Sequence, residues 1–311
     1  MRHVIALDGG GTGVRAALVG LDGTPLHEAR RAFGRGSVVE SVLRCAEELR
    51  AEGQRRFGTG AEAAGVAVPG SLREVPLREL LGRRLGRIPV AVAYGVRAAG
   101  LAEGRLGAGR GAGGFLFVSL GRRVAGAVGT GRGVETGAHG GAGEIGHVVV
   151  RPGGPACGCG RRACLDAVPS PAAVARDWAA ASGAADAGAA GCVRAVRRGD
   201  AAAAEVWRAA VEALADGLIT AHTLLDCRTV IIGGGLAEAG DTLFVPLRAA
   251  VKERIAFRKL PELVPAALGA AAGCLGAGLL AADLLAVPPR AGSCPDRGGV
   301  RTSGEPATGR R

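Results

Sequence analysis

The sequence predicts an α/β protein with two similar lobes around a cleft. Short apolar strands alternate with longer segments of helical periodicity along most of the 311 residues. After the glycine-rich stretch LGAGRGAGG (106–114), the opening arrangement of paired strands starts again. Because a repeated α/β unit forms its own layered core, we expect one lobe over residues 1–110 and a larger one over 111–270.

In the first lobe, three strands are expected to form an antiparallel meander before the first helix. They read HVIALDGG, VRAALVGLDG and TPLHEARRAF, and the turn Asp22-Gly23 closes the second. A helix follows over about 37–55 with Ser37 as its N-cap. The remaining expected elements of this lobe are the strands 65–70 and 88–95 and the helix 77–85 between them.

The second lobe is expected to begin with another hairpin and to continue with Ala-rich helices. We expect the hairpin strands GFLFVSLGR and VAGAVGTG, helices within 171–226, the strand RTVIIGGG and two further helices. The last helix, 271–286, is expected to complete the first lobe. Residues 288–311 lack a hydrophobic period, which is typical of a disordered tail.

The composition, 48% hydrophobic and 22% charged, indicates a soluble, enzyme-sized protein. The N-terminus lacks the apolar run of a secretory signal, so a cytoplasmic location is expected. Residues 264–282 carry no charge, but they include Pro265 and are mostly Ala and Gly, so we interpret them as a buried turn and helix and expect no membrane contact.

The formal net charge of +11 does not by itself indicate a nucleic-acid partner. The basic residues are almost all arginines dispersed through every segment, and aromatic residues make up only 3%. A scattered charge produces little directed field, so binding to nucleic acid is not expected.

A histidine and three cysteines fall within HVVVRPGGPACGCGRRAC (147–164). Cys157 and Cys159 can face one ion if Gly158 and Gly160 allow a tight turn, and Cys164 follows five residues later. With His147 they supply the four ligands of a closed zinc site. This pattern favours zinc over a redox pair or a chance cluster.

Two glycine-rich turns are candidates for binding phosphate. Asp8-Gly9-Gly10-Gly11-Thr12 joins two strands, where backbone amides and the Thr12 hydroxyl could contact an oxyanion and Asp8 could hold Mg²⁺ through water. Gly233-Gly234-Gly235 follows a strand and precedes a predicted helix, whose N-terminal dipole would favour a nucleotide phosphate.

In their order along the chain, these segments resemble the ROK family of bacterial sugar kinases and sugar-responsive repressors. The resemblance rests on LDGGGTGVRAALVGLDG, GVAVPG, GGAGEIGH (140–147), CGCGRRACLD (157–166), VIIGGGLAEAG (230–240) and ALGAAAGCLGAG (267–278). It implies the two-lobed actin-like ATPase (ribonuclease H-like) fold and glucokinase-like, ATP-dependent phosphorylation of a hexose. Mg-ATP and a sugar are the implied ligands, and a homodimer or homotetramer is the implied assembly.

The resemblance also implies roles for the EIGH segment. Glu144 and His147 would contact the sugar hydroxyls, and His147 would also bind a structural zinc together with Cys157, Cys159 and Cys164. Metal at one ring nitrogen would orient the other toward a hydroxyl. Ala163 and Asp166 stand where the family usually has glycine and glutamate.

A larger departure lies in AVAYGVRAAGLAE (91–103). Aligned with the family on Leu101 and Glu103, Gly95 occupies the place of the aspartate that removes the proton from the sugar's 6-hydroxyl. Tyr94 and Arg97 replace two asparagines. No Asp or Glu lies between Glu79 and Glu103, so no shift of the alignment restores a base there.

Two further motifs differ from the family pattern. The turn LGTGIGGG, which approaches the γ-phosphate, reads LGRRVAGA with Arg122 and Arg123. Only SLRE (71–74) remains of a longer loop that carries a sugar-binding asparagine. Since a general base contributes roughly 10²–10⁴ in rate, these changes together predict a catalytically impaired homologue. An active kinase with another base is the alternative; a repressor without its winged helix is a third.

Overall fold

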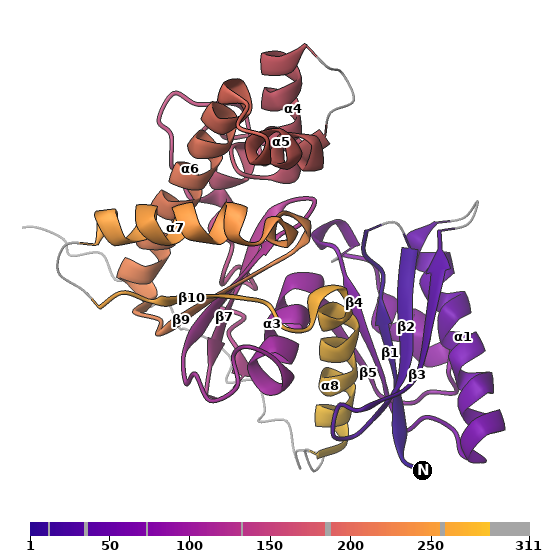
Figure 1. The fold of residues 1–311 in the computed structure, drawn as a ribbon. Coiled ribbons are helices and arrows are strands. Elements are labelled where there is room, and N and C mark those ends of the chain that lie inside the picture. The colour runs from indigo at the N-terminus through magenta and orange to yellow at the C-terminus, as the bar shows by residue number, and fades with distance from the viewer. Residues whose placement is uncertain are drawn as a thin grey trace, which may run out of the picture.

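The computed structural model describes residues 1–11, 13–33, 37–72, 74–131, 133–183, 188–255 and 259–286. Within them the chain forms two five-stranded sheets and eight α-helices (Figure 1). This confirms the predicted α/β class. The tail at 288–311 and Thr12 lie outside the described residues.

The first sheet contains β1 (His3–Asp8), β2 (Gly13–Gly20), β3 (Pro25–Ala32), β4 (Ala64–Val68) and β5 (Val90–Tyr94). Its strand order is β3-β2-β1-β4-β5. The first three strands form the predicted antiparallel meander, and β4 and β5 run parallel to β1.

The second sheet repeats this topology. It contains β6 (Phe115–Leu120), β7 (Val124–Thr130), β8 (Gly133–Val134), β9 (Thr229–Gly233) and β10 (Glu262–Pro265), in the order β10-β9-β6-β7-β8. The hairpin β6–β7 and the strand β9 were predicted, whereas β8 and β10 were not. The two residues of β8 are too few to show alternation, and Pro265 ends β10 inside a segment that we had interpreted as a turn.

The α-helices are α1 (Val38–Phe57), α2 (Leu77–Arg84), α3 (Gly95–Leu106), α4 (Pro171–Ser182), α5 (Gly188–Arg197), α6 (Ala201–Leu225), α7 (Asp241–Arg254) and α8 (Ala272–Ala286). Ser37 caps α1 as predicted, with its hydroxyl accepting from the backbone N–H of Glu40. One apolar core lies between the first sheet and α1 and α2, and a larger one lies between the second sheet and α4–α7.

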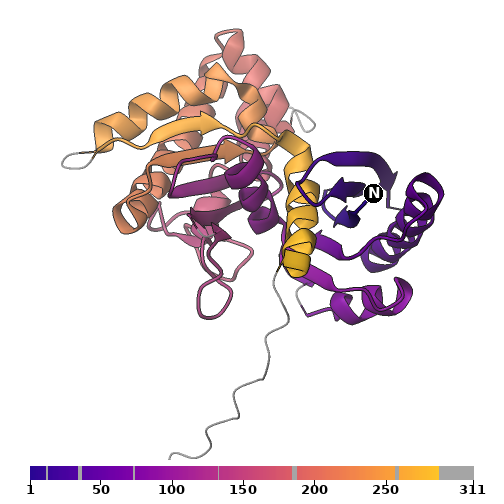
Figure 2. The same ribbon diagram turned by 90° about the horizontal axis from the view of Figure 1, so that it is seen from below.

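Helices α3 and α8 lie between the two sheets (Figures 1 and 2). Helix α8 contacts β1 and β4 although it follows β10 in the chain, so the last helix packs against the first sheet. Glycines permit this packing: a Cβ on Gly65 would lie 1.9 Å from the carbonyl oxygen of Ala277, and one on Gly276 would lie 1.8 Å from that of Ala98. Gly269–Ala286 is long and apolar enough for a membrane span, and half of it is buried within the protein.

Glu103 on α3 binds both segments in which the chain passes from one sheet to the other. Its side chain is fully buried. One carboxyl oxygen accepts from the backbone N–H groups of Ala108 (2.9 Å) and Ala267 (3.1 Å), and the other from that of Leu268 (2.8 Å). A single side chain therefore joins the segment after α3 to the segment before α8.

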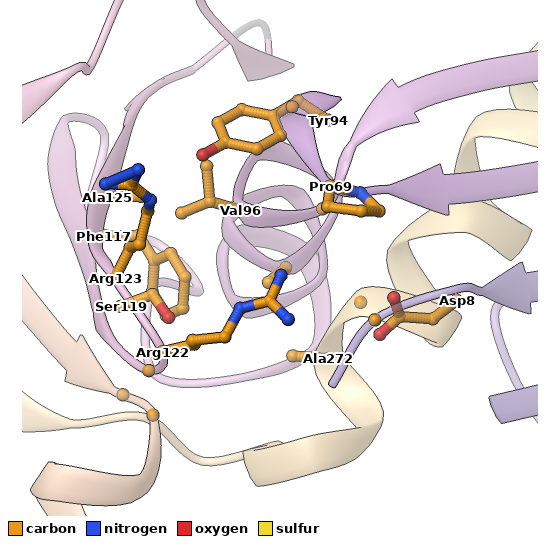
Figure 3. Close-up of a pocket in the computed structure, with 18 of the residues that line it drawn as sticks. Asp8, Pro69, Tyr94, Val96, Phe117, Ser119, Arg122, Arg123, Ala125 and Ala272 are labelled. Carbon is orange, nitrogen blue, oxygen red and sulfur yellow. The ribbon is translucent and has the colours of Figure 1, made fainter. Parts of the chain in front are cut away.

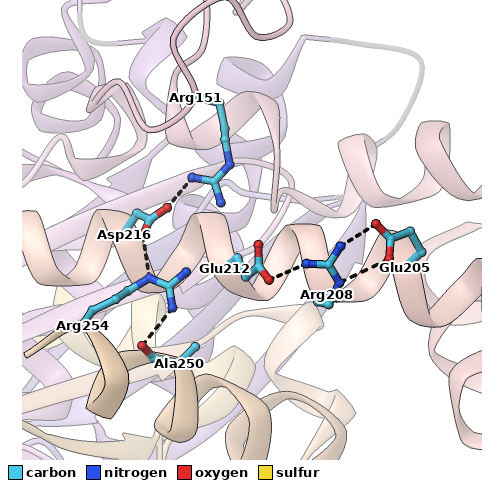
Figure 4. Close-up of polar contacts among 7 residues, drawn as sticks. All are labelled: Arg151, Glu205, Arg208, Glu212, Asp216, Ala250 and Arg254. Carbon is cyan, nitrogen blue, oxygen red and sulfur yellow. Dashed lines mark hydrogen bonds and ion pairs between the residues drawn. The ribbon is translucent and has the colours of Figure 1, made fainter.

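Helix α6 carries a row of charged contacts on its exposed side (Figure 4). Asp216 accepts from Arg254 of α7 at 2.6 Å and from Arg151, which lies between His147 and Cys157 in the 147–164 segment. Although partial burial opposes the effect, these hydrogen bonds lower the pKa of Asp216 below its ordinary value. Asp216, which lies on α6, thus links the 147–164 segment to α6 and α7.

We predict that Glu103→Gln destabilises the protein by about 1–3 kcal/mol, because at least one buried N–H then faces an amide N–H instead of an acceptor. Urea unfolding at equilibrium measures this. Glu79→Gln, at an exposed residue that pairs with the exposed Arg83 at 3.7 Å, is the control and should change stability little. Equal stabilities of the two variants would contradict the role given to Glu103.

Candidate functional site

A cavity of about 840 Å³ opens between the two sheets, at the carboxyl ends of their strands (Figure 3). Turns after β1, β4, β5, β6 and β9 all contribute to its walls. Ligands commonly bind at this edge of α/β sheets, because the strand ends leave backbone groups and loops free to contact them. The segments selected from the sequence meet here.

The turn after β1 places Asp8 and Gly10 in the cavity wall, while Gly11 is exposed and does not line it. The start of α8 lies directly against the carboxyl group, since a Cβ on Gly273 would be 2.4 Å from one of its oxygens. Burial raises the pKa of Asp8 to about 6, while Arg15 acts in the opposite direction. A divalent cation or a donor near this carboxyl would therefore be stabilising.

The second glycine turn meets the β6–β7 turn. Gly233 and Gly234 line the cavity, and Gly235 does not. A Cβ on Gly234, whose φ is 87°, would lie 2.7 Å from the backbone nitrogen of Gly121, so only glycine fits there. A helix follows this turn, but its first part is a five-residue 3₁₀ helix at Gly235–Ala239, and α7 begins only at Asp241. The long helix of this lobe therefore does not start directly at the glycine turn.

The EIGH segment rests directly on strand β7. A Cβ on Gly143 would lie 2.6 Å from the carbonyl oxygen of Gly126, and one on Gly146 would lie 2.0 Å from that of Val124. These two glycines let the backbone approach the strand and bring Glu144 and His147 into the cavity wall.

His147 and the three cysteines form one cluster, with all four ligand atoms within 4.8 Å of one another. His147 Nδ1 is 3.8 Å from the sulfur of Cys157, and the sulfurs of Cys159 and Cys164 are 3.7 Å apart. Tetrahedral ligands at about 2.0–2.3 Å from an ion would be separated by roughly 3.5–3.8 Å. The donor set therefore fits a metal ion, with the histidine's Nδ1 toward it.

The tight turn predicted from the glycines is present in this cluster. The backbone N–H of Cys157 donates to Arg161, and Gly160 has φ of 89°. A hydrogen bond from the Arg161 backbone lowers the pKa of the Cys159 thiol to about 6, whereas burial raises that of Cys164 to about 11.

The two departures from the family pattern near the cysteines have structural consequences. Ala163 adopts a φ of 64°, in the left-handed region that glycine reaches without strain. This backbone conformation explains why a glycine would suit the position. Asp166 is buried and accepts from Arg123 (2.7 Å) and from the backbone N–H of Val124 (2.6 Å). It joins the β6–β7 turn to the cysteine segment.

Gly95 begins α3 and lines the cavity beside Tyr94. A Cβ there would meet only the carbonyl oxygen of Val68, at 3.6 Å, so the backbone leaves room for a Cβ at this position. Arg97, two residues further along α3, donates to the carbonyl oxygens of Gly140 and Ala142, just before the EIGH segment.

The contact between Arg97 and the 140–142 segment was not anticipated. The sequence identifies Arg97 only as a replacement for asparagine, and nothing in its spacing shows that the side chain reaches a segment more than forty residues away. Its Nε is buried without a hydrogen-bond partner.

Arg122 and Arg123 both line the cavity, with different surroundings. Arg123 is held by Asp166. Arg122 makes no hydrogen bond or ion pair with any described residue, and its guanidinium extends into the cavity toward the side of Asp8 and Ala272 (Figure 3).

Comparison with known proteins identifies the family. A sequence model of the ROK family matches residues 4–284. The chain belongs to the ROK family. It is 33% identical to a glucokinase of Thermotoga maritima over 88% of this chain and 95% of that protein.

Solved structures agree with this assignment. The ROK hexokinase from Thermus thermophilus superposes with a TM-score of 0.82 at 30% identity, covering 91% of this chain and 99% of that one. A ROK family glucokinase from Streptomyces griseus, solved with glucose and AMPPNP, gives a TM-score of 0.76 at 27% identity over 90% and 99% of the two chains. The chain is thus a homologue of glucokinase-like hexose kinases with the actin-like ATPase fold.

We predict that Gly146→Ala destabilises the protein by about 1–3 kcal/mol, because its methyl group would overlap the carbonyl oxygen of Val124 and displace the EIGH segment. The free energy of unfolding in urea is the measurement. Gly141→Ala in the same segment is the control, since a Cβ there meets nothing within 4 Å. If both variants are as stable as the original chain, the close approach to β7 does not position this segment.

Proposed function

We propose that this protein binds a hexose and Mg-ATP in the cavity between its sheets but transfers phosphate very slowly, if at all. The observation that carries the proposal is the absence of a side chain at Gly95. In the family, an aspartate at this position removes the proton from the sugar's 6-hydroxyl. We therefore expect the chain to bind both ligands without transferring phosphate efficiently between them.

The carboxyl groups that do line the cavity are poorly placed to replace that base. Among the described lining residues these are Asp8 and Glu144. Asp8 lies in the turn proposed for Mg²⁺ and phosphate, and Glu144 stands beside His147, where it would accept hydrogen bonds from sugar hydroxyls. Each would have to abandon its binding role to act as the base.

For recognition, the proposal uses the groups already in place. Glu144 and the outward-facing ring nitrogen of His147 would contact sugar hydroxyls, while Asp8, Gly10, Gly233 and Gly234 would contact Mg²⁺ and phosphate. Gly11, Gly235 and Thr12 stay sequence-based candidates. We place the protein in the cytoplasm, and we expect a dimer or tetramer by analogy with the family.

We further propose that the ion held by His147, Cys157, Cys159 and Cys164 is zinc with a structural role. Three thiolates and an imidazole are ligands that zinc prefers, and they leave no open position for chemistry. Bound through Nδ1, the metal would hold the imidazole so that its other nitrogen faces the cavity.

We predict that the pure protein produces no sugar-dependent ADP from Mg-ATP with glucose, mannose, N-acetylglucosamine or N-acetylmannosamine. Coupled ADP detection measures this. Gly95→Asp alone should not restore turnover, although a Cβ fits at this position, because Arg122 and the short 71–74 segment also differ from the family pattern. Turnover of about 1 s⁻¹ or more by the unmodified chain would contradict the proposal of impaired catalysis and favour an active kinase with another base.

Elemental analysis should find about one zinc per chain, because a closed four-ligand site retains its ion through purification. The double substitution Cys157→Ser, Cys159→Ser should lose the metal together with solubility. Cys192→Ser, at a buried thiol outside the cluster, should keep the metal. A metal-free double variant as stable as the original would show that zinc has no structural role.

A further inference from the structure

From the surroundings of Arg122 in the cavity we infer that it is a phosphate-binding residue and that the proposed sugar site also takes a sugar phosphate monoester. This inference rests on the proposed sugar site at Glu144 and His147. It deepens that proposal by naming a further class of ligand for the sugar site.

The first reason is the difference between two adjacent arginines. Arg123 is neutralised by the buried Asp166 and has a structural role. Arg122 has neither a carboxyl partner nor a hydrogen bond among the described residues, and its guanidinium extends into the cavity (Figure 3). A guanidinium can donate two parallel hydrogen bonds to one phosphate group, and no group of the uncharged sugar matches that charge.

The second reason is the short path between Arg122 and the sugar site. Arg122 is two residues before Val124, whose carbonyl oxygen lies against Gly146, and His147 is the next residue. The turn with Arg122 and the segment with His147 are thus packed together on one wall. One small molecule could place hydroxyl groups at His147 and a phosphate at Arg122.

The third reason concerns the alternative source of a phosphate, the nucleotide. In Mg-ATP the metal already neutralises much of the phosphate charge, and catalysis depends on close approach of backbone amides. Arg122 replaces a small residue in the turn that serves this approach in the family. A metal-free sugar phosphate dianion needs a cation from the protein, which Arg122 supplies.

Isothermal titration of the intact, metal-loaded protein tests the inference. The ligands are glucose, glucose 6-phosphate, the corresponding mannose, N-acetylglucosamine and N-acetylmannosamine pairs, inorganic phosphate and Mg-ATP. We expect at least one sugar phosphate to bind about tenfold or more tightly than its parent sugar. Arg122→Gln should weaken that binding by roughly 10- to 100-fold, as expected for lost charge-assisted hydrogen bonds, and leave the parent sugar unaffected.

Two control variants separate this inference from the proposed function. Arg110→Gln removes the same charge at an exposed position outside the cavity and should leave every affinity unchanged. Glu144→Gln should weaken both the sugar and its phosphate. If no sugar or sugar phosphate binds at all, the proposed sugar site fails and this inference fails with it.

Other outcomes overturn the inference alone. One such outcome is equal affinity for a sugar and its phosphate. Another is an Arg122→Gln variant with unchanged affinity for the sugar phosphate. Either result would show that Arg122 does not bind the phosphate, although the proposed sugar site would remain. Inorganic phosphate binding as tightly as the sugar phosphate would indicate a plain anion site. A loss of Mg-ATP affinity alone in Arg122→Gln would make the nucleotide the source of the phosphate.

Discussion

The shape of the cavity depends on one buried carboxyl group. Glu103 accepts backbone hydrogen bonds from both segments that connect the sheets, and it does so from the helix that lies between them. Because these N–H groups are removed from water, they need an acceptor at that place. The two sheets are therefore held at a common point while their strand ends stay apart and leave the cavity open.

Around that point, glycine allows backbone to approach backbone. Gly65 and Gly276 bring α8 against β4 and α3, and Gly143 and Gly146 bring the EIGH segment onto β7. The same principle explains Gly234 beside the β6–β7 turn. In each case a methyl group would overlap a main-chain atom, so the walls of the cavity depend on residues that carry no functional group themselves.

The cavity combines features retained from the family with features that are changed. Asp8, Glu144 and His147 line the cavity, His147 also belongs to the cysteine cluster, and the likeness to glucokinases extends over nearly the whole chain. Gly95 and Arg122 also line this cavity. We propose that Gly95 leaves it without the family's base and that Arg122 adds a cation, which is why we separate ligand binding from phosphoryl transfer.

The sequence by itself determined the α/β class, the meander and its repetition, the Ser37 cap and the grouping of His147 with the three cysteines. These follow from local periodicity and from spacing within a few residues. Only the tertiary structure decided that β10 pairs at the sheet edge, that a 3₁₀ helix separates Gly234 from α7, and that Arg97 reaches the 140–142 segment. It also distinguished Arg122 from Arg123, which are equivalent in the sequence, because a salt bridge depends on where Asp166 lies in space and not on its distance along the chain.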